Sequence, residues 1–310
     1  MTKASAPGKI ILSGEHAVVY GRPALAIPVT KVSARVEISD SNRPGIWIHA
    51  GDIQLHSELS SLPESHPLGV AIHKVLDHSS LPKTPQLAVS IKSNIPIASG
   101  MGSGAAISVA LIRALAGHLQ VTLSQDEVSN LAFEIEKIHH GTPSGIDNTV
   151  IVYAQPVYYL KGKPVEFFLP GGRFDLVIGY TGVPAPTRES VDTVRRLWEG
   201  DRTRWEKLFD QIGVITCAAR GAIETARWEE LGGLMDKNHA LLQELTVSSP
   251  ELDGLVHAAR KNGALGAKLS GGGRGGNMIA LVSQPALEQV ESALLVAGAR
   301  RVIRTSVASM

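Results

Sequence analysis

The run "SGMGSGAA", at residues 99–106, can be accommodated by few folds. Three glycines alternate with other residues and lead into the apolar stretch at 105–119, whose apolar side chains repeat with the 3.6-residue period of a helix. A plain turn needs one or two glycines, whereas three directly before a helix let a ligand lie close to the backbone. Because helix N-termini attract anions, the run predicts a phosphate site; a glycine-rich turn for close helix packing is the alternative.

The spacing of these glycines excludes two common nucleotide motifs. No Gly-Lys-Ser/Thr follows, as it does in a Walker A loop. Gly100, Gly102 and Gly104 alternate, which differs from the G-x-G-x-x-G pattern of dinucleotide sites.

Composition excludes several classes of protein. The 310 residues carry 30 basic and 29 acidic side chains, a net charge of +1 that gives no support to nucleic-acid binding. Cys217 is the one cysteine, so no disulfide framework or cysteine-based metal site is expected. Glu15 and His16 interrupt the first apolar stretch, and no apolar run approaches the roughly 18 residues of a membrane helix. We therefore predict a soluble, cytoplasmic protein that binds neither nucleic acid nor membrane.

The periodicity predicts a mixture of helices and strands in two domains, 1–170 and 171–310, divided at the Pro-Gly-Gly of 170–172. A capping box, Ser124 with Glu127, begins one helix. The second domain reads as a split α+β unit. In the first domain the expected strands are 9–13, 24–29, 32–39, 87–91, 149–153 and 157–160, and the expected helices 69–78, 105–119 and one after 124. In the second domain the expected strands are 175–180, one between residue 262 and the "SGGGRGG" of 270–276, 277–282 and 299–305. The expected helices lie across 188–245 and at 250–262 and 285–297.

Three side chains outside the glycine run carry possible chemistry. Lys9 stands at the mouth of a strand, where a single lysine is usually just exposed. Asp147 lies in "HGTPSGIDN", where an aspartate is typical of an Asx turn. Glu136 is near the C-terminal end of its helix, where the helix dipole disfavours a carboxylate, so a cation such as Mg²⁺ or Lys137 is expected beside it. Each of these side chains alone is weak evidence of function.

Together these stretches supply what phosphoryl transfer needs: a phosphate cradle, a carboxylate for a divalent ion, a cation, and a group that orients the attacking hydroxyl. A further glycine-rich stretch, "KLSGGGRGGNMIAL", lies at 268–281. In this order, and over essentially its whole length, the chain resembles the family of galacto-, homoserine, mevalonate and phosphomevalonate kinases. Within it, "GKIILSGEHAVVYG" and "HGTPSGIDN" look like the mevalonate kinases.

The resemblance implies an α+β fold, with an N-terminal domain like ribosomal protein S5 and a C-terminal ferredoxin-like domain, and ATP and Mg²⁺ as cofactors. Asp147 would be the catalytic aspartate, and Lys9 would neighbour it, lower its pKa and stabilise the transferring phosphate. Glu136, together with Ser103, would bind the metal. Positions on the acceptor side match Glu15, His16 and Thr187. The nucleotide phosphates would bind at Ala98, Ser99, Gly100, Met101, Gly102, Ser103 and Gly104.

Two positions depart from the pattern of the family. Its loop commonly carries a second serine that is associated with Mg²⁺, and here that place is Gly104, which leaves Ser103 as the only hydroxyl. Mg²⁺ keeps several waters, so Glu136, phosphate oxygens and water can suffice. Arg274 interrupts a loop that is usually glycine and alanine; it could reach a phosphate or project into solvent, and we favour solvent.

The resemblance predicts phosphorylation of the primary hydroxyl of mevalonate, and it allows a homodimer. The alternatives are a kinase of phosphomevalonate or homoserine, a decarboxylase of the same pathway, and a catalytically silent nucleotide-binding module. Arg188 and Lys31 are available to a phosphorylated substrate. The presence of Lys9, Glu136 and Asp147 together argues against the silent module.

Overall fold

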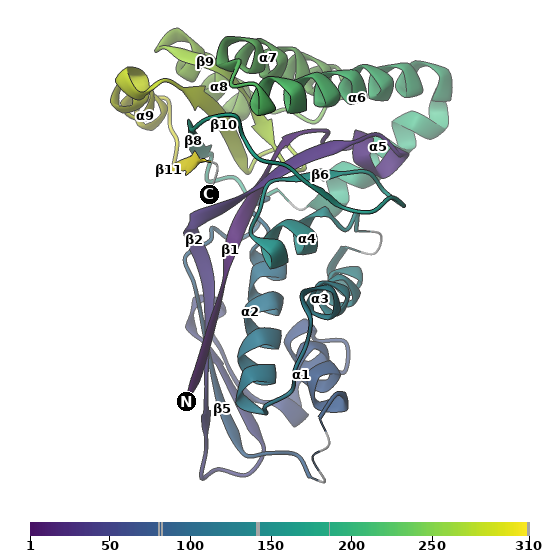
Figure 1. Cartoon of the computed structure of the whole chain (residues 1–310), viewed down its shortest axis with the longest axis vertical. Helices are drawn as coiled ribbons and strands as arrows, with labels where there is room; N and C mark the ends of the chain where they lie inside the picture. The colour runs from purple at the N-terminus through teal and green to yellow at the C-terminus, as the bar shows by residue number, and fades with distance from the viewer. Residues whose placement is uncertain (80, 82, 141–142, 186, 309–310) are drawn as a thin grey trace. The chain divides into compact units, whose positions relative to one another are not determined.

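The computed structural model describes residues 1–79, 81, 83–140, 143–185 and 187–308, without the side chains of 139–140 and 187–188. The chain is α+β, as predicted, and forms two sheets (Figure 1). It divides into two compact units. The first consists of Met1–Gly8, Val32–Pro96 and Gly102–Ala154, and the second of Lys9–Lys31, Ile97–Met101 and Gln155–Met310. These bounds differ from the predicted domains 1–170 and 171–310, and that division stays a prediction.

The first sheet has seven strands in the order β4-β3-β5-β2-β6-β7, with β1 beside β2. The strands are β1 (Thr2–Ser13), β2 (Ala24–Asp40), β3 (Ile46–Ala50), β4 (Leu55–Glu58), β5 (Leu87–Ser93), β6 (Val157–Tyr159) and β7 (Glu166–Phe167). The two strands predicted at 24–29 and 32–39 are the single strand β2. Its side chains alternate between buried and more exposed from Val32 to Ile38, as the period-2 pattern predicted.

The α-helices of the first unit are α1 (Pro67–Asp77), α2 (Ser103–His118), α3 (Gln125–His140) and α4 (Ile146–Tyr153). Figure 1 shows α1, α2 and α3 beside one another on one side of β5. The predicted capping box is confirmed: the Ser124 backbone donates to Glu127 Oε2 at 2.7 Å, and the Glu127 backbone donates to Ser124 Oγ at 3.2 Å. This reciprocal pair satisfies backbone donors where α3 begins.

The strand predicted at 149–153 was wrong, because these residues form the end of α4. Four β-branched residues from Thr149 to Val152 favour a strand locally. Here Gly145, at φ 91°, begins a helix, and Thr149 Oγ1 donates back to the Gly145 carbonyl at 2.8 Å. The helix is buried on most of its surface, so its sequence lacks the apolar period that distinguishes an amphipathic helix from a buried strand.

The second unit contains a four-stranded antiparallel sheet in the order β11-β8-β10-β9. Its strands are β8 (Phe174–Tyr180), β9 (Ala264–Ser270), β10 (Asn277–Val282) and β11 (Arg301–Val307). Its helices are α5 (Thr187–Gly200), α6 (Arg202–Glu224), α7 (Trp228–Glu244), α8 (Pro250–Lys261) and α9 (Leu287–Val296). Helices separate β8 from β9 and β10 from β11, which is the β-α-β-β-α-β arrangement of a ferredoxin-like fold.

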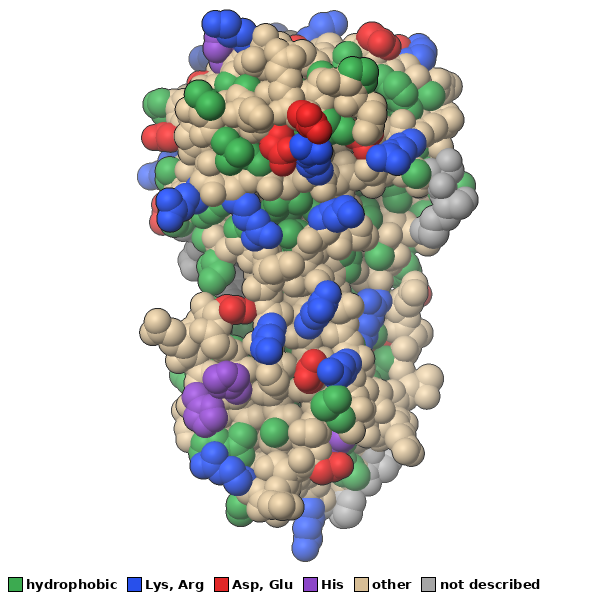
Figure 2. All heavy atoms as spheres, turned by 90° about the vertical axis from the view of Figure 1, so that its left-hand side faces the viewer, with side chains coloured by type: hydrophobic (Ala, Val, Ile, Leu, Met, Phe, Trp, Pro, Cys, Tyr) green, Lys and Arg blue, Asp and Glu red, His purple; other side chains and the backbone are tan. Residues whose placement is uncertain are grey.

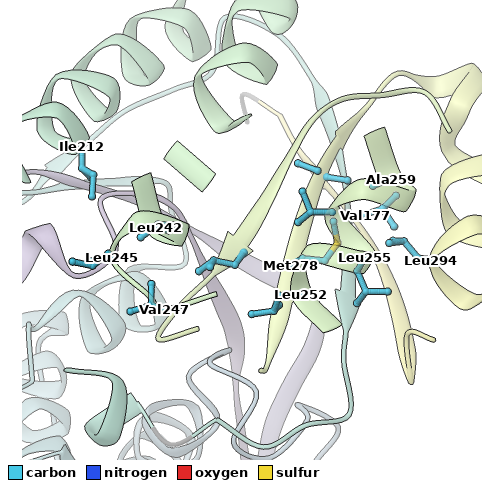
Figure 3. Packing of buried hydrophobic residues seen from close by; sticks show 14 of the residues in the cluster. Val177, Ile212, Leu242, Leu245, Val247, Leu252, Leu255, Ala259, Met278 and Leu294 are labelled. Atoms are coloured by element: carbon cyan, nitrogen blue, oxygen red, sulfur yellow. The ribbon is translucent and has the colours of Figure 1, made fainter. Parts of the chain in front are cut away.

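The core of this unit lies between the sheet and its helices (Figure 3). Val177 and Met278 of the sheet pack with Leu255 of α8 and Leu294 of α9. The N-terminal segment contributes as well. In the 3₁₀ turn Ala17–Tyr20, Ala17 belongs to the same buried cluster, and the Tyr20 ring stacks on Phe209 with centroids 4.3 Å apart. Residues from both ends of the chain therefore build this core.

Helix α7 and strand β9 approach each other at two glycines. A Cβ on Gly232 would lie 2.2 Å from the Leu265 carbonyl oxygen, and one on Gly266 would lie 2.1 Å from the Gly232 carbonyl oxygen. Both obstacles are backbone atoms, which cannot rotate away. The contact therefore requires the absence of a side chain at both positions.

The outer surface is mixed in charge over the face shown in Figure 2, where basic and acidic side chains are interspersed. This fits a chain with 30 basic and 29 acidic residues. Cys217 is exposed and carries a free thiol. In the part of the chain that the structure describes, no helix is both long and apolar enough to cross a bilayer.

The buried His239 of α7 predicts a loss of stability in mild acid. The Leu269 backbone donates to its Nδ1 at 3.3 Å, and burial lowers the pKa of this imidazole from 6.5 to about 4. The unfolded chain therefore binds more protons between pH 6.5 and 4, so stability is complete above pH 6.5 and falls toward pH 4, by up to about 3 kcal/mol for one such group. Urea unfolding of His239→Gln should show a shallower decline over this range than the wild type, and equal slopes would contradict the assignment.

Candidate active site

The glycine run leads into α2 through alternating left-handed residues. Ala98, Gly100 and Gly102 have φ of 52°, 83° and 71°, and Gly102 is the N-cap of α2. Left-handed residues that alternate with others turn successive backbone N–H groups toward a common point, a geometry that binds anions. The backbone thus has the form expected of a phosphate loop. Ser99 and Met101 are buried, so their contribution to such a site comes from the main chain.

A second glycine loop, at 271–276, braces residues 97–101 within the second unit. Asn277 Nδ2 donates to the Ser99 carbonyl at 2.6 Å, and the Ala185 backbone donates to the Ala98 carbonyl at 3.1 Å. A Cβ on Gly276 would lie 2.8 Å from the Ser99 carbonyl oxygen. The glycines of the two loops therefore allow two backbones to lie in contact.

In the first unit the start of α2 meets the carboxylate of Glu136. A Cβ on Gly104 would lie 3.4 Å from Glu136 Oε1, although the two residues are 32 positions apart. Glu136 is buried near the C-terminal end of α3, where the helix dipole favours a cation over an anion. A buried carboxylate next to the N-terminus of α2 is an oxygen ligand of the kind that Mg²⁺ prefers.

Asp147 lies in the first turn of α4, with Gly145 as N-cap, rather than in the open loop that an Asx turn would make. The next residue fixes the helix: Asn148 Nδ2 donates to the Ser129 carbonyl at 3.2 Å and to Ser129 Oγ at 2.9 Å. Since Ser129 belongs to α3, which carries Glu136, the elements that bear both carboxylates are tied together. Asp147 also lies at the N-terminal end of α4, where the helix dipole is positive.

Three of the predicted site residues lie in the second unit: Lys9 is within β1, and Glu15 and His16 follow its last residue, Ser13. The Lys9 backbone donates to the Met101 carbonyl at 3.0 Å, which ties β1 to the phosphate loop. His16 has a φ of 60°, a left-handed conformation that strains a residue with a side chain. Gly14, at φ 98°, precedes it, and a Cβ there would lie 2.4 Å from the Pro23 carbonyl oxygen. The "SGEH" sequence therefore allows a sharp turn, in which the side chains of Glu15 and His16 are buried.

Burial sets the protonation of this group. Desolvation, helped by the positive charges of Arg274 and Lys268, lowers the pKa of His16 to about 4. At neutral pH the imidazole is therefore uncharged, and because the Gly272 carbonyl, 3.0 Å from Nε2, can only accept, Nε2 carries the hydrogen. Nδ1 is then an acceptor for a ligand hydroxyl. Burial raises the pKa of Glu15, against the opposing charges of Lys268 and Lys9.

Three residues of the second unit that contact Glu15, the end of β1 or the glycine run were missed by the sequence analysis. Lys268 is ion-paired with Glu15, Ser270 Oγ donates to the Ile11 carbonyl at 2.8 Å, and Asn277 holds Ser99. A lysine between the apolar residues Ala267 and Leu269, directly before a glycine loop, was the available signal for Lys268. A charged residue in an otherwise buried strand requires a partner.

Arg274 is exposed, as favoured from the sequence, and has a φ of 61°. It lines an open pocket of about 560 Å³ with residues of α5, among them Thr193 and Arg196. Thr187 begins α5, and its side chain lies outside the described residues, as do those of His139 and His140.

The structure brings the predicted residues together in two groups. Gly104 and Glu136 meet in the first unit, and Lys9, Glu15 and His16 surround the end of β1 in the second. Asp147 and Lys9 belong to different units, and their pairing stays a prediction.

Two family models match this chain and cover more than half of it. The GHMP kinases N terminal domain matches residues 67–155, and the GHMP kinases C terminal domain matches residues 219–298. The chain belongs to the GHMP kinase family. It is therefore an ATP-dependent kinase of small molecules, and the glycine run, α2 and "HGTPSGIDN" all fall inside the N-terminal match.

Curated relatives extend the similarity over nearly the whole chain. The mevalonate kinase of Pyrococcus furiosus is 37% identical over 314 residues, which cover 95% of this chain and 93% of the relative. The mevalonate kinase of Saccharolobus solfataricus is 32% identical, with 91% and 90% covered.

Solved structures share the fold. L. major mevalonate kinase in complex with R-mevalonate has a TM-score of 0.86 and 31% identity, covering 100% of this chain and 96% of that one. Streptococcus pneumoniae phosphomevalonate kinase has a TM-score of 0.83 with 98% and 100% covered, but at 17% identity it shows the fold alone.

Proposed function

We propose that this GHMP kinase transfers the terminal phosphoryl group of ATP to the primary hydroxyl of mevalonate, giving 5-phosphomevalonate and ADP. The observation that carries the proposal is the 37% identity, over 95% of the chain, to a mevalonate kinase. The similarity to the mevalonate kinase that was crystallised with R-mevalonate supports it. The hydroxyl oxygen bonds to the γ-phosphorus, the bond to the β-phosphate oxygen breaks, and the hydroxyl loses its proton.

Each group of residues takes one part of this reaction. Backbone N–H groups of 98–104 bind the phosphates of the nucleotide. Asp147 accepts the hydrogen bond of the attacking hydroxyl, and Lys9 neutralises charge on the transferring phosphoryl group. Glu15, His16 and Thr187 bind the other polar groups of the acceptor, so that the primary hydroxyl is the one presented for attack.

Mg²⁺ fits the residues that the first unit brings together. The buried Glu136 carboxylate would hold it, close to Ser103 and Gly104, and oxygen ligands on a helix N-terminus suit a hard cation. When bound, the ion would neutralise phosphate charge. Gly104→Ser would bring a side chain into van der Waals contact with Glu136 Oε1, so a serine hydroxyl at this position could join the same site.

Glu136→Gln should raise, several-fold, the Mg²⁺ concentration that gives half-maximal rate, because the ion loses a charged ligand. Glu134→Gln is the matched control, since Glu134 is exposed on the same helix and pairs with Lys137. Steady-state rates over a Mg²⁺ titration measure the effect. An unchanged Mg²⁺ dependence in Glu136→Gln would assign this carboxylate a structural role.

The decisive test of the function is the ³¹P NMR spectrum of the product formed from ATP and mevalonate. A 5-phosphate is expected. Parallel reactions with phosphomevalonate and homoserine test the other kinases, and release of CO₂ tests the decarboxylase. No reaction with mevalonate beside rapid reaction with one of the others would overturn the proposal.

A further inference from the structure

Lys268 and Glu15 form an ion pair that is removed from water inside the second unit. Their exposed fractions are 0% and 1%, and Lys268 Nζ donates to Glu15 Oε1. The ammonium group also donates to the Leu269 carbonyl at 2.6 Å. Removing both charges from water costs about as much free energy as their attraction returns, so stability alone does not account for such a pair.

Only one oxygen of the Glu15 carboxylate is used. Among the described residues, Oε2 has no hydrogen-bond donor although it is buried. Buried polar atoms in folded proteins nearly always have a partner. Because a carboxylate oxygen only accepts, the missing partner is an O–H or N–H group and not another carboxylate. The unpaired oxygen thus indicates where a ligand donor binds.

The residues that hold this carboxylate and its neighbours come from β9 and from the loop that follows β9. Lys268 holds Glu15, Ser270 Oγ bonds both the amide and the carbonyl of Ile11, and the Gly272 carbonyl accepts from His16. Lys268 and Ser270 are two positions apart, so their side chains lie on the same face of β9, whereas Gly272 contributes a backbone carbonyl from the loop after it. Together they fix the end of β1 and the turn that presents Glu15 and His16.

We propose that Lys268 is a positioning residue: it fixes the Glu15 carboxylate so that Oε2 accepts a hydrogen bond from the acceptor hydroxyl that is not phosphorylated. This inference rests on the proposed function, in which the acceptor is mevalonate and that group is its tertiary 3-hydroxyl. The carboxylate of mevalonate would be repelled by Glu15, so the hydroxyl is the group that faces it. Lys268 does not touch the substrate and acts through Glu15.

The test compares mevalonate with 5-hydroxy-3-methylpentanoate, which lacks only the 3-hydroxyl. A charge-assisted hydrogen bond should make the wild type prefer mevalonate by about a hundredfold in kcat/KM. Lys268→Met, which keeps the length of the side chain but not its charge, should reduce that preference to less than about tenfold by lowering activity on mevalonate alone. The KM for ATP should stay within about threefold, because the nucleotide does not meet Glu15. Glu15→Gln should also reduce the preference for mevalonate over 5-hydroxy-3-methylpentanoate.

Thr216→Val is the matched control. It removes a fully buried hydroxyl of α6 that bonds Ser13 Oγ at 2.8 Å, two residues before Glu15, and the Ile212 carbonyl. Because these bonds involve neither Glu15 nor Lys268, the variant should keep the preference for mevalonate. Thermal unfolding checks each variant. If Lys268→Met does not fold, Lys268→Arg takes its place, since a displaced cation also moves the carboxylate.

The outcomes separate the two proposals. A wild type that does not phosphorylate mevalonate overturns the proposed function. If the wild type phosphorylates mevalonate, the Lys268 variant decides the positioning role. A folded variant that keeps the full preference for mevalonate, or that loses activity equally on both substrates, overturns that role alone.

Discussion

Asp147→Asn is expected to lower kcat by about a thousandfold or more while the affinity for ATP changes by less than about threefold. The amide keeps the size of the side chain but is a poor acceptor for the proton of the attacking hydroxyl. In the proposed function the nucleotide phosphates bind instead to the backbone of 98–104, whose residues the substitution does not change. Single-turnover phosphorylation of mevalonate and a direct ATP-binding titration measure the two quantities separately.

Asp77→Asn is the control for this substitution. Asp77 is an exposed carboxylate at the last residue of α1, in the same unit as Asp147, and its loss should leave kcat unchanged. Near-normal turnover of Asp147→Asn would remove this residue from the mechanism. A parallel loss of ATP binding would show that it holds the phosphate loop.

Gly232→Ala is expected to destabilise the protein by about 3 kcal/mol or more, because its methyl group would lie 2.2 Å from the Leu265 carbonyl oxygen and force α7 away from β9. The neighbouring Gly233 is the matched control, since a Cβ there would meet nothing within 4 Å. Gly233→Ala should therefore gain the usual helix preference of alanine, about 0.5–1 kcal/mol.

The midpoints of urea unfolding decide between the two glycines. Opposite signs for adjacent substitutions in one helix isolate the contact with β9 from helix propensity. Equal effects would show that α7 does not approach β9 as closely as described. Because Lys268 lies on β9, a folded Gly232→Ala should also lose part of its preference for mevalonate.

Local patterns were enough to predict most of the fold. The apolar period of α2, the Ser124 capping box and the alternation of β2 each depend on a few neighbouring residues, and each was found where expected. Helix α4 was mistaken for a strand because its β-branched residues favour a strand locally, while its burial and Gly145 decide for a helix. That decision depends on packing, which a short stretch of sequence does not contain.

The site was predicted in its parts and not in its contacts. The glycine run indicated a phosphate loop, and the order of the motifs indicated a kinase. The proximity of Gly104 to Glu136 and the pair of Lys268 with Glu15 join residues 32 and 253 positions apart, and nothing in either local sequence names its partner. In particular, the sequence around Lys268 does not show that this lysine is buried, because its burial depends on how β9 packs in the fold.

The 3₁₀ turn at Ala17–Tyr20 completes the core of the second unit, and this affects when that core can fold during synthesis. The ribosome makes this turn some 190 residues or more before Phe209 and Met278, which share its core. Until then its apolar side chains remain uncovered, and closing so long a loop is slow. The core of the second unit therefore cannot be completed until the residues up to Met278 have been made, and removing either the turn or β10 should damage the same core.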